Sequence, residues 1–258
     1  MPELKIAVQL RAFGQPFKQA LHTAASVGAT AVEIDARNDL RPTEITDTAC
    51  RQLRKMLNDL NLRISSVRFQ TRHGYDYLPR LNQRVDATKA AMRMAYRLGC
   101  NLVVNQIGRV PAETESPAYQ QLATVLSDLG RFGTHVGACL AAETGTEPCE
   151  RLAELLAMDE QMFVGVAFNP GNLILNGFAV ADGLRCLTDR LQLVVAHDAV
   201  QDLARGRGIE VPLGEGIADF PEILGRLEDS RYRSWFVVGK PGDGTEAVSS
   251  GIQYLRCL

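Results

Sequence analysis

Short apolar runs in this chain end repeatedly in polar residues. The clearest runs cover residues 136–142, 163–168, 191–196 and 235–238. The polar residues at or just beyond their ends are Glu143, Asn169, His197, Asp198 and Lys240. Apolar runs of this length are typical of buried strands. Each pattern therefore predicts a strand that delivers a carboxylate, an amide, an imidazole or an ammonium group to its carboxyl end.

Four earlier runs end in the same way. Their polar residues are Gln9, Glu33, Asp35, Arg68, Gln70, Asn105 and Gln106. Together, the two sets predict one polar pocket that is able to bind a small ligand. For Asp35, Asn105 and Asp198, a hydrogen bond that anchors a loop is an equally good interpretation.

The elements that must position these residues alternate between strand and helix. Eight strands are predicted, at residues 5–10, 31–35, 63–69, 101–106, 136–143, 163–169, 191–198 and 235–238. Between them, apolar residues recur at helical spacing, most clearly in residues 45–60 and 81–98. Gly28 and Gly99 each precede a predicted strand, so we expect each to end a helix in the left-handed conformation.

Eight strand-helix units predict a single (β/α)8 TIM barrel that covers residues 1–258 as one domain. In that fold, the carboxyl ends of the strands and the loops that follow them line the active site. An open doubly wound sheet is the structural alternative. It would usually carry a glycine-rich phosphate-binding turn after the first strand, and residues 11–15 do not form one.

The composition argues against several function classes. The formal net charge is -2 and no basic cluster is evident, so nucleic acid is not an expected partner. The apolar runs are too short to span a membrane, and residues 1–10 do not resemble a secretion signal, so we expect a cytoplasmic protein. The cysteines lack metal-binding or disulfide spacing. His135 and Cys139 are predicted to share one face of a strand, where packing is the expected role of the thiol.

Four segments carry a family resemblance. They are Val-Glu-Ile-Asp-Ala-Arg at 32–37, Ala-Glu-Thr-Gly at 142–145, Asn-Pro-Gly-Asn-Leu at 169–173 and Pro-Leu-Gly-Glu-Gly at 212–216. In this order they resemble the xylose-isomerase-like TIM barrels, the sugar phosphate isomerase/epimerase family, over nearly the whole chain. The resemblance implies a divalent cation held by Glu, Asp, His and Glu from the last four strands, with the glutamates acting as acid and base. Such a cation stabilises the enediolate that forms when a proton is removed beside a carbonyl.

The sequence keeps one of the four ligands that the resemblance implies. Glu143 matches the first glutamate and is the expected catalytic residue. Asn169 stands at the aspartate, Val195 at the histidine and Gly239 at the final glutamate. One carboxylate and one amide offer too little negative charge for tight binding of a divalent cation, so no cofactor is expected. Restoring all three ligands, as Asn169→Asp, Val195→His and Gly239→Glu, is expected to create metal affinity with little backbone rearrangement.

Two further residues leave alternatives open. His197 lies two residues beyond Val195 on the same face of the predicted strand, so it either replaces the lost histidine or forms a loop hydrogen bond near Asp198. Lys240 either brings its ammonium group to the pocket, in place of the cation's charge, or lies in solvent. Two basic loops either hold a phosphate or carboxylate group or are solvated, and their residues are Arg68, Arg72, His73, Tyr75, Arg205 and Arg207.

Two functions follow from these observations. The first is a sugar or sugar-phosphate isomerase/epimerase-like protein that binds a small polyhydroxylated ligand at the carboxyl-terminal barrel mouth. The second is a catalytically inactive ligand-binding or scaffold protein of the same fold. The ligand-binding residues expected in either case are Glu33, Arg68, Asn105, Gln106, Asn169, His197 and Lys240. Metal-dependent abasic-site endonucleases share this barrel, but they need more metal ligands and basic loops that face DNA. A homo-oligomer is compatible with the sequence.

Overall fold

Eight parallel strands close into a barrel in the computed structural model, which describes residues 4–158, 163–202 and 207–258. The strands are β1 (Lys5–Gln9), β2 (Ala31–Asp35), β3 (Arg63–Arg68), β4 (Leu102–Asn105), β5 (Cys139–Glu143), β6 (Val164–Phe168), β7 (Leu191–Ala196) and β10 (Trp235–Val238). Around the barrel, β10 lies between β7 and β1, and the other strands follow chain order. The predicted TIM barrel is therefore confirmed.

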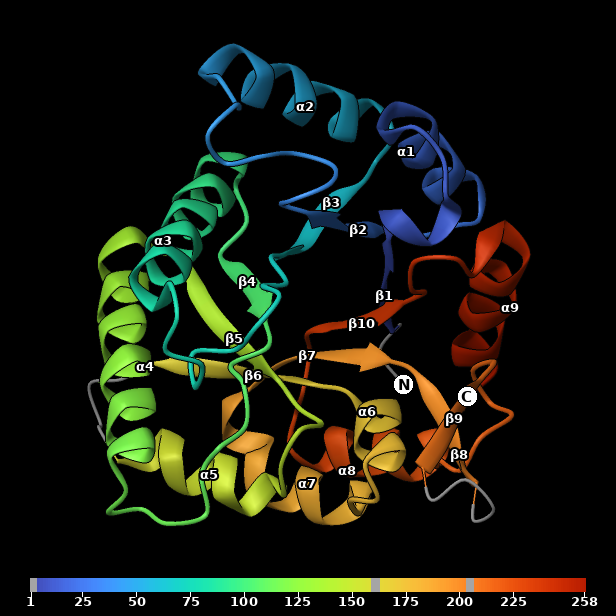
Figure 1. Ribbon diagram of the computed structural model, residues 1–258. Helices are drawn as coiled ribbons and strands as arrows, with labels where there is room; N and C mark the ends of the chain where they lie inside the picture. The colour runs from blue at the N-terminus through green and yellow to red at the C-terminus, as the bar shows by residue number, and fades with distance from the viewer. Residues whose placement is uncertain (1–3, 159–162, 203–206) are drawn as a thin grey trace.

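The helices surround this barrel (Figure 1). They are α1 (Phe17–Ser26), α2 (Asp47–Asp59), α3 (Leu81–Leu98), α4 (Pro117–Val136), α5 (Cys149–Ala157), α6 (Pro170–Leu175), α7 (Val180–Leu187), α8 (Phe220–Asp229) and α9 (Gly244–Cys257). Two short 3-10 helices are η1 (Leu10–Phe13) and η2 (Thr188–Arg190). Each long helix buries one apolar stripe; in α2 this stripe is Cys50, Leu53 and Leu57.

Local sequence signals fix where the helices begin and end. The hydroxyl of Thr46 accepts a hydrogen bond from Ala49 N at the start of α2, and Ser116 caps α4 in the same way. Gly28 and Gly99 have φ angles of 82° and 81°, as predicted for glycines that end a helix. These turns bring the chain back to the next strand, so each strand runs in the same direction.

Burial on both faces explains the nearly continuous apolar strands. All five residues of β6 are buried, because one face packs inside the barrel and the other packs under helices. Polar residues enter the barrel at the carboxyl ends of the strands. The register pairs Gln9 with Glu33 and Glu143 with Ala167, which places the polar ends at one mouth.

The structure differs from the predicted elements around β5. Val136 ends α4 rather than starting a strand, and Gly137 follows it in the left-handed conformation. His135 is therefore helical, and the prediction that it shares a strand face with Cys139 is wrong. The two-residue alternation of a strand does not apply across a helix end.

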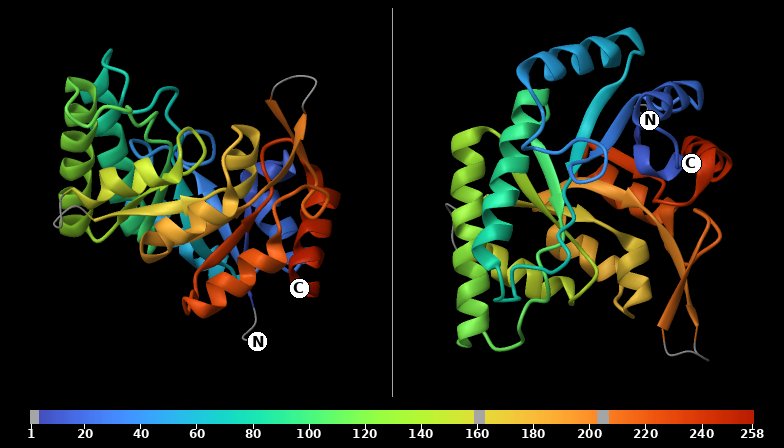
Figure 2. Two further views of the ribbon diagram at one scale, coloured as in Figure 1. Left: turned by 90° about the horizontal axis from the view of Figure 1, so that it is seen from below. Right: turned by 45° about the horizontal axis from the view of Figure 1, so that its top comes forward.

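A second difference follows β7. The predicted strand at 191–198 ends at Ala196, and His197 N donates to Val195 O at 2.8 Å across a tight turn. The chain then forms an antiparallel hairpin of β8 (Asp198–Asp202) and β9 (Arg207–Val211), which projects beyond the barrel (Figure 2). The sequence did not predict this hairpin. No helix among the described residues is both long and apolar enough to cross a membrane.

Candidate functional site

Arg68 lies between two glutamates at the carboxyl ends of the strands. Its Nε donates to Oε1 of Glu33 at 2.6 Å, and its Nη1 donates to Oε2 of Glu143 at 2.7 Å. All three side chains are buried. The end of β3 thus supplies a cation that joins the carboxylate at the end of β5 to the carboxylate on β2.

Glu33 is held by side chains from the two neighbouring strands, β1 and β3. Its Oε1 also accepts from Gln9 Nε2 at 2.9 Å, and its Oε2 accepts from the Ser66 hydroxyl at 2.7 Å. Ser66 and Arg68 lie two residues apart on β3, so alternation places both on the inner face. Ser66 was missed in the sequence, although this alternation would have found it once Arg68 was assigned to the inner face.

Glu143 accepts three side-chain hydrogen bonds. Its Oε1 accepts from Asn169 Nδ2 at 2.9 Å, and its Oε2 accepts from Gln70 Nε2 at 3.4 Å in addition to Arg68. The Asn169 amide is fixed in this orientation because its Oδ1 accepts from Asn172 N at 3.0 Å and so caps α6. The N–H side of the amide must therefore face Glu143.

His197 completes the chain of contacts toward β10. Its Nδ1 lies 3.4 Å from Asn169 Nδ2, and its Nε2 lies 3.4 Å from Gly239 O. Since the amide nitrogen can only donate and the carbonyl can only accept, these contacts fit a neutral imidazole that carries its proton on Nε2. His197 therefore points inward to the site, rather than toward Asp198.

The charges of the site stabilise one another. Burial alone would raise the pKa of Glu143, but the Arg68 charge and the donors from Arg68 and Asn169 lower it below its ordinary value. Burial lowers the pKa of His197, and Arg68 adds to this effect against the opposing influence of Glu143. Burial also acts to lower the pKa of Arg68, but Glu143 and Glu33 outweigh it and raise the pKa. At neutral pH the site holds an ionised Glu143, a charged Arg68 and a neutral His197.

Val195 and Gly239 offer no ligand atom from their side chains. Val195 is 1% exposed on β7. Gly239 has a φ of 89°, and a Cβ placed on it would lie 2.8 Å from Ala12 Cβ. A glutamate at 239 would therefore require both backbone and neighbours to move. The expectation that the three-ligand restoration needs little rearrangement is wrong at this position.

Three other expected ligand-binding residues have partners outside the central cluster. Asn105 Oδ1 accepts from Thr71 N at 3.1 Å, and its Nδ2 donates to the Tyr75 hydroxyl at 2.9 Å. Gln106 Nε2 donates to Thr71 O at 2.6 Å. Asn105 and Gln106 thus anchor the loop that follows β3. Lys240 Nζ forms an ion pair with Glu210 on β9 and ties the hairpin to the end of β10.

Asp198 is a loop anchor, which was one of the two interpretations of its position. Its carboxylate accepts from the backbone N–H groups of Ala199, Gly214, Gly216 and Ala218 at 2.8 to 3.0 Å. These bonds hold the Leu-Gly-Glu-Gly turn against the hairpin. The sequence could not reveal this contact because the partners lie up to 20 residues away.

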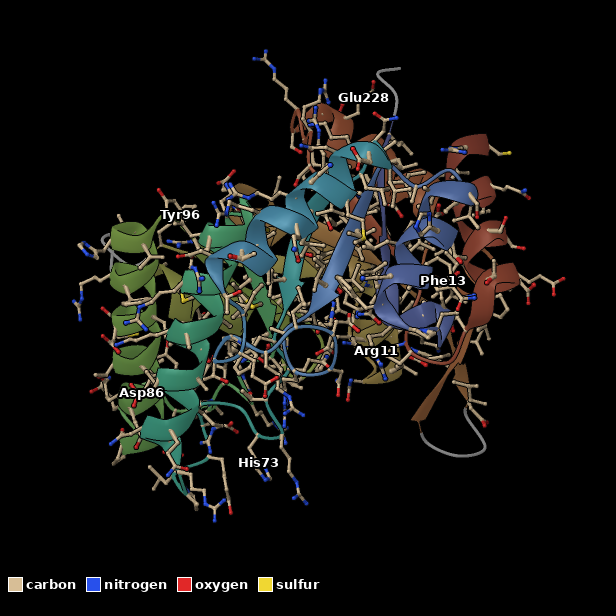
Figure 3. All side chains as sticks on the ribbon, turned by 90° about the horizontal axis from the view of Figure 1, so that it is seen from above. Arg11, Phe13, His73, Asp86, Tyr96 and Glu228 are labelled. Carbon is tan, nitrogen blue, oxygen red and sulfur yellow. The ribbon has the colours of Figure 1, made fainter. Side chains whose placement is uncertain are left out.

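The first basic loop separates into buried and exposed parts. Tyr75 is fully buried, whereas His73 is exposed and stacks on Tyr77 with ring centroids 4.4 Å apart. Figure 3 shows His73 at the edge of the molecule, on the loop that leads into α3. In the second basic loop, Arg205 and the Arg207 side chain lie outside the described residues.

A polar cavity of about 660 Å³ lies beside the central cluster. It is bounded by the loop after β2 and the end of β3, and its lining includes Asp35, Arg37, Arg41, Gln70 and Thr71. Gln70 lies between the cavity and the central cluster, because it lines the cavity and its amide also donates to Glu143. A cavity of about 720 Å³ lies at the amino ends of the strands, near Lys5 and Phe236, away from the polar cluster.

Residues 21–258 match the family model of the xylose isomerase-like TIM barrel. The chain belongs to this family. A xylose isomerase domain protein from Planctomyces limnophilus is 22% identical with a TM-score of 0.86, and the match covers 98% of this chain and 96% of that one. A D-tagatose 3-epimerase-like protein is 15% identical with a TM-score of 0.79 over 98% and 96% of the two chains. No curated protein matches the chain.

One further family neighbour was solved in complex with magnesium. This xylose isomerase-like TIM barrel protein from Mycobacterium smegmatis is 14% identical with a TM-score of 0.75, over 98% of this chain and 96% of that one. In the described part of the present chain, no group of three or more His, Cys, Asp and Glu side chains is placed to hold a metal ion. At these identities the comparison shows the shared fold alone.

Proposed function

We propose that this family member binds a small polyhydroxylated, sugar-like ligand at the carboxyl-terminal mouth of its barrel. The observation that carries the proposal is the hydrogen-bonded cluster of Glu33, Arg68, Glu143, Asn169 and His197, which come from five different strand ends or loops. Such clusters at this end of a TIM barrel form its ligand sites. The structural neighbours include a D-tagatose 3-epimerase-like protein and a protein named as a sugar phosphate isomerase/epimerase.

We further propose that the divalent metal site typical of the family is largely lost. Both oxygens of Glu143 already accept from N–H donors, and Asn169 Oδ1 is committed to the cap of α6. A cation beside Glu143 would compete with the N–H groups of Arg68 and Asn169, and would lie close to the positive charge of Arg68. Residues 195 and 239 add no donor atom. This set of groups does not fit a divalent cation.

Glu143 is the proposed catalytic residue, in an isomerase- or epimerase-like reaction that uses no metal. Its lowered pKa makes it a weak base, and this property favours the second candidate function, a catalytically inactive ligand-binding or scaffold protein. His197 is the other group able to take a proton, because its neutral imidazole faces Asn169 through Nδ1. Asn105 and Gln106 contribute by fixing the loop after β3, and Lys240 by holding the hairpin at the mouth.

Incubation with ketohexoses in deuterated buffer tests both functions. D-tagatose and D-psicose are suitable probes, with binding measured by ligand-observed NMR and exchange measured at the carbons beside the carbonyl. A metal-free isomerase-like protein binds a ketose and exchanges deuterium, and Glu143→Gln abolishes the exchange. An inactive binding protein binds without exchange. Glu150→Gln, an exposed change on α5, is the matched control. Absence of binding to any ketose, or epimerisation that requires added Mn²⁺, would contradict the proposal.

A further inference from the structure

Two buried polar atoms at the centre of the site have no hydrogen-bond partner among the described residues. They are Nη2 of Arg68 and Oε1 of Gln9, and their residues are 5% and 4% exposed. An unpaired buried donor or acceptor costs about 1 to 3 kcal/mol. Two such atoms in one site therefore point to a partner that the chain itself does not supply.

The two free atoms belong to side chains that meet at one point. Gln9 Nε2 and Arg68 Nε both donate to Oε1 of Glu33, at 2.9 and 2.6 Å. Glu33 thereby orients the amide and the guanidinium together. Nη2 of Arg68 is a donor that carries two hydrogens, and Oε1 of Gln9 is an acceptor.

We propose that Arg68 and Gln9 form a recognition point for an α-hydroxy carbonyl group. Nη2 of Arg68 donates to the carbonyl oxygen, and Oε1 of Gln9 accepts from the adjacent hydroxyl. The guanidinium is always charged, so it polarises the carbonyl from a protein side chain, as a bound cation would in other members of the family. This assignment rests on the proposed function. It specifies that the site recognises the carbonyl oxygen and the adjacent hydroxyl of the ligand.

The charges at this point favour a neutral ligand over an anion. Arg68 carries one positive charge and already pairs with Glu33 and Glu143. A carboxylate or phosphate at Nη2 would add a third negative group to one cation in a buried site, where like charges repel strongly. A carbonyl oxygen gains the hydrogen bond without that repulsion.

Gln70 lies between this point and the polar cavity. Its amide is the longest contact of Glu143, at 3.4 Å, and the same residue lines the cavity beside Arg37. The remainder of a polyhydroxylated chain therefore extends from Arg68 past Gln70 toward the cavity. Displacement of the Gln70 amide breaks one weak hydrogen bond and leaves the two short ones of Arg68 in place.

Three four-carbon probes test the assignment. Erythrulose is a ketose that cannot close into a stable ring. Erythritol carries a hydroxyl in place of its carbonyl, and erythronate carries a hydroxyl there and a carboxylate at the adjacent terminal carbon. Dissociation constants are measured by ligand-observed NMR for the wild type, Arg68→Lys and Gln9→Met, with the exposed change Arg51→Lys as control. Thermal melts check that each variant is folded.

The wild type is expected to prefer erythrulose over both analogues. Arg68→Lys should weaken erythrulose binding roughly tenfold while changing erythritol binding little, because the loss is that of a charged hydrogen bond to the carbonyl. Gln9→Met should weaken the binding of erythrulose and erythritol alike, because each carries a hydroxyl that can donate to Oε1 of Gln9. Equal loss for erythrulose and erythritol in Arg68→Lys indicates a merely structural role and overturns the inference, as does a preference for erythronate. If the wild type binds no erythrulose and no ketohexose, the proposed function itself fails.

Discussion

Asn169→Asp replaces the amide donor beside Glu143 with a carboxylate and changes almost nothing else. The new side chain has the same shape and can still cap α6, because the oxygen that accepts from Asn172 N is retained. The atom that contacts Glu143 Oε1 at 2.9 Å, however, turns from a donor into an acceptor. The variant therefore isolates the charge balance of the site.

The magnitude follows from this distance. Two unit charges 2.9 Å apart repel by about 6 kcal/mol at an effective dielectric constant near 20. The pair can avoid this by binding one proton, which costs about 4 kcal/mol at pH 7 for a carboxyl group with an ordinary pKa near 4. Proton uptake is the cheaper route, so we expect the free energy of unfolding to fall by about 4 kcal/mol at pH 7.

The pH dependence gives the sharper test. In the wild type the pKa of Glu143 is lowered, so its contribution to stability is complete above the ordinary value and is lost as pH falls through the folded-state pKa. In Asn169→Asp the shared proton raises the pKa of the pair above the unfolded value. Stability is then lost as pH rises from about 4 toward the raised pKa.

Urea unfolding of both proteins at a series of pH values between about 4 and 8 measures this difference, with the exposed first-turn change Asn82→Asp of α3 as control. We predict that Asn169→Asp loses clearly more stability than the wild type as pH rises across this range, and that the control follows the wild type. A variant as stable as the wild type at pH 7, with no added metal, would refute the assignment of Asn169 as a donor to Glu143.

Three other changes test separate parts of the structure. Gly239→Ala should lower the free energy of unfolding by about 1 to 3 kcal/mol in denaturant titrations, because φ is 89° and the new Cβ would lie 2.8 Å from Ala12 Cβ; a neutral effect would contradict the close packing there. Glu147→Gln should stabilise the protein above pH 7, because burial raises the pKa of Glu147 to about 7 and the wild type loses stability as pH rises through that value; thermal melts at pH 6 and 8 should differ less in the variant. Asp198→Asn should cost about 2 to 3 kcal/mol in urea, since an amide oxygen cannot match a carboxylate that accepts four backbone N–H groups, and a loss of only a few tenths would argue against its anchoring role.

The barrel could be predicted because its signals are local. Apolar runs, helical spacing and the glycines at 28 and 99 each act within a few residues, and together they fix the order of strands and helices. The β8–β9 hairpin could not be found in this way. It continues directly from β7 after one turn residue, His197, and it is held by Lys240 and by Asp198, whose partners lie far along the chain.

The polar ends of the strands were also predictable, but their partners were not. Because the strands are parallel, Arg68 and Glu143 lie at the same barrel mouth, yet nothing in the sequence says that the arginine would lie between two glutamates. That contact depends on the stagger of β2, β3 and β5 around the closed barrel. The left-handed backbone at Gly239 and its closeness to Ala12 were likewise not predictable from local sequence. They show that a glutamate at this position would be strained in the present backbone.

The central claim is that Arg68 and Asn169 balance the charge of Glu143 without a metal. Calorimetric titration of the wild type with Mn²⁺, preceded by elemental analysis of the purified protein, tests it most directly. We predict no stoichiometric metal in the purified protein and no saturable heat of binding at the barrel mouth. Tight binding of about one Mn²⁺ per chain that is abolished by Glu143→Gln would contradict the claim.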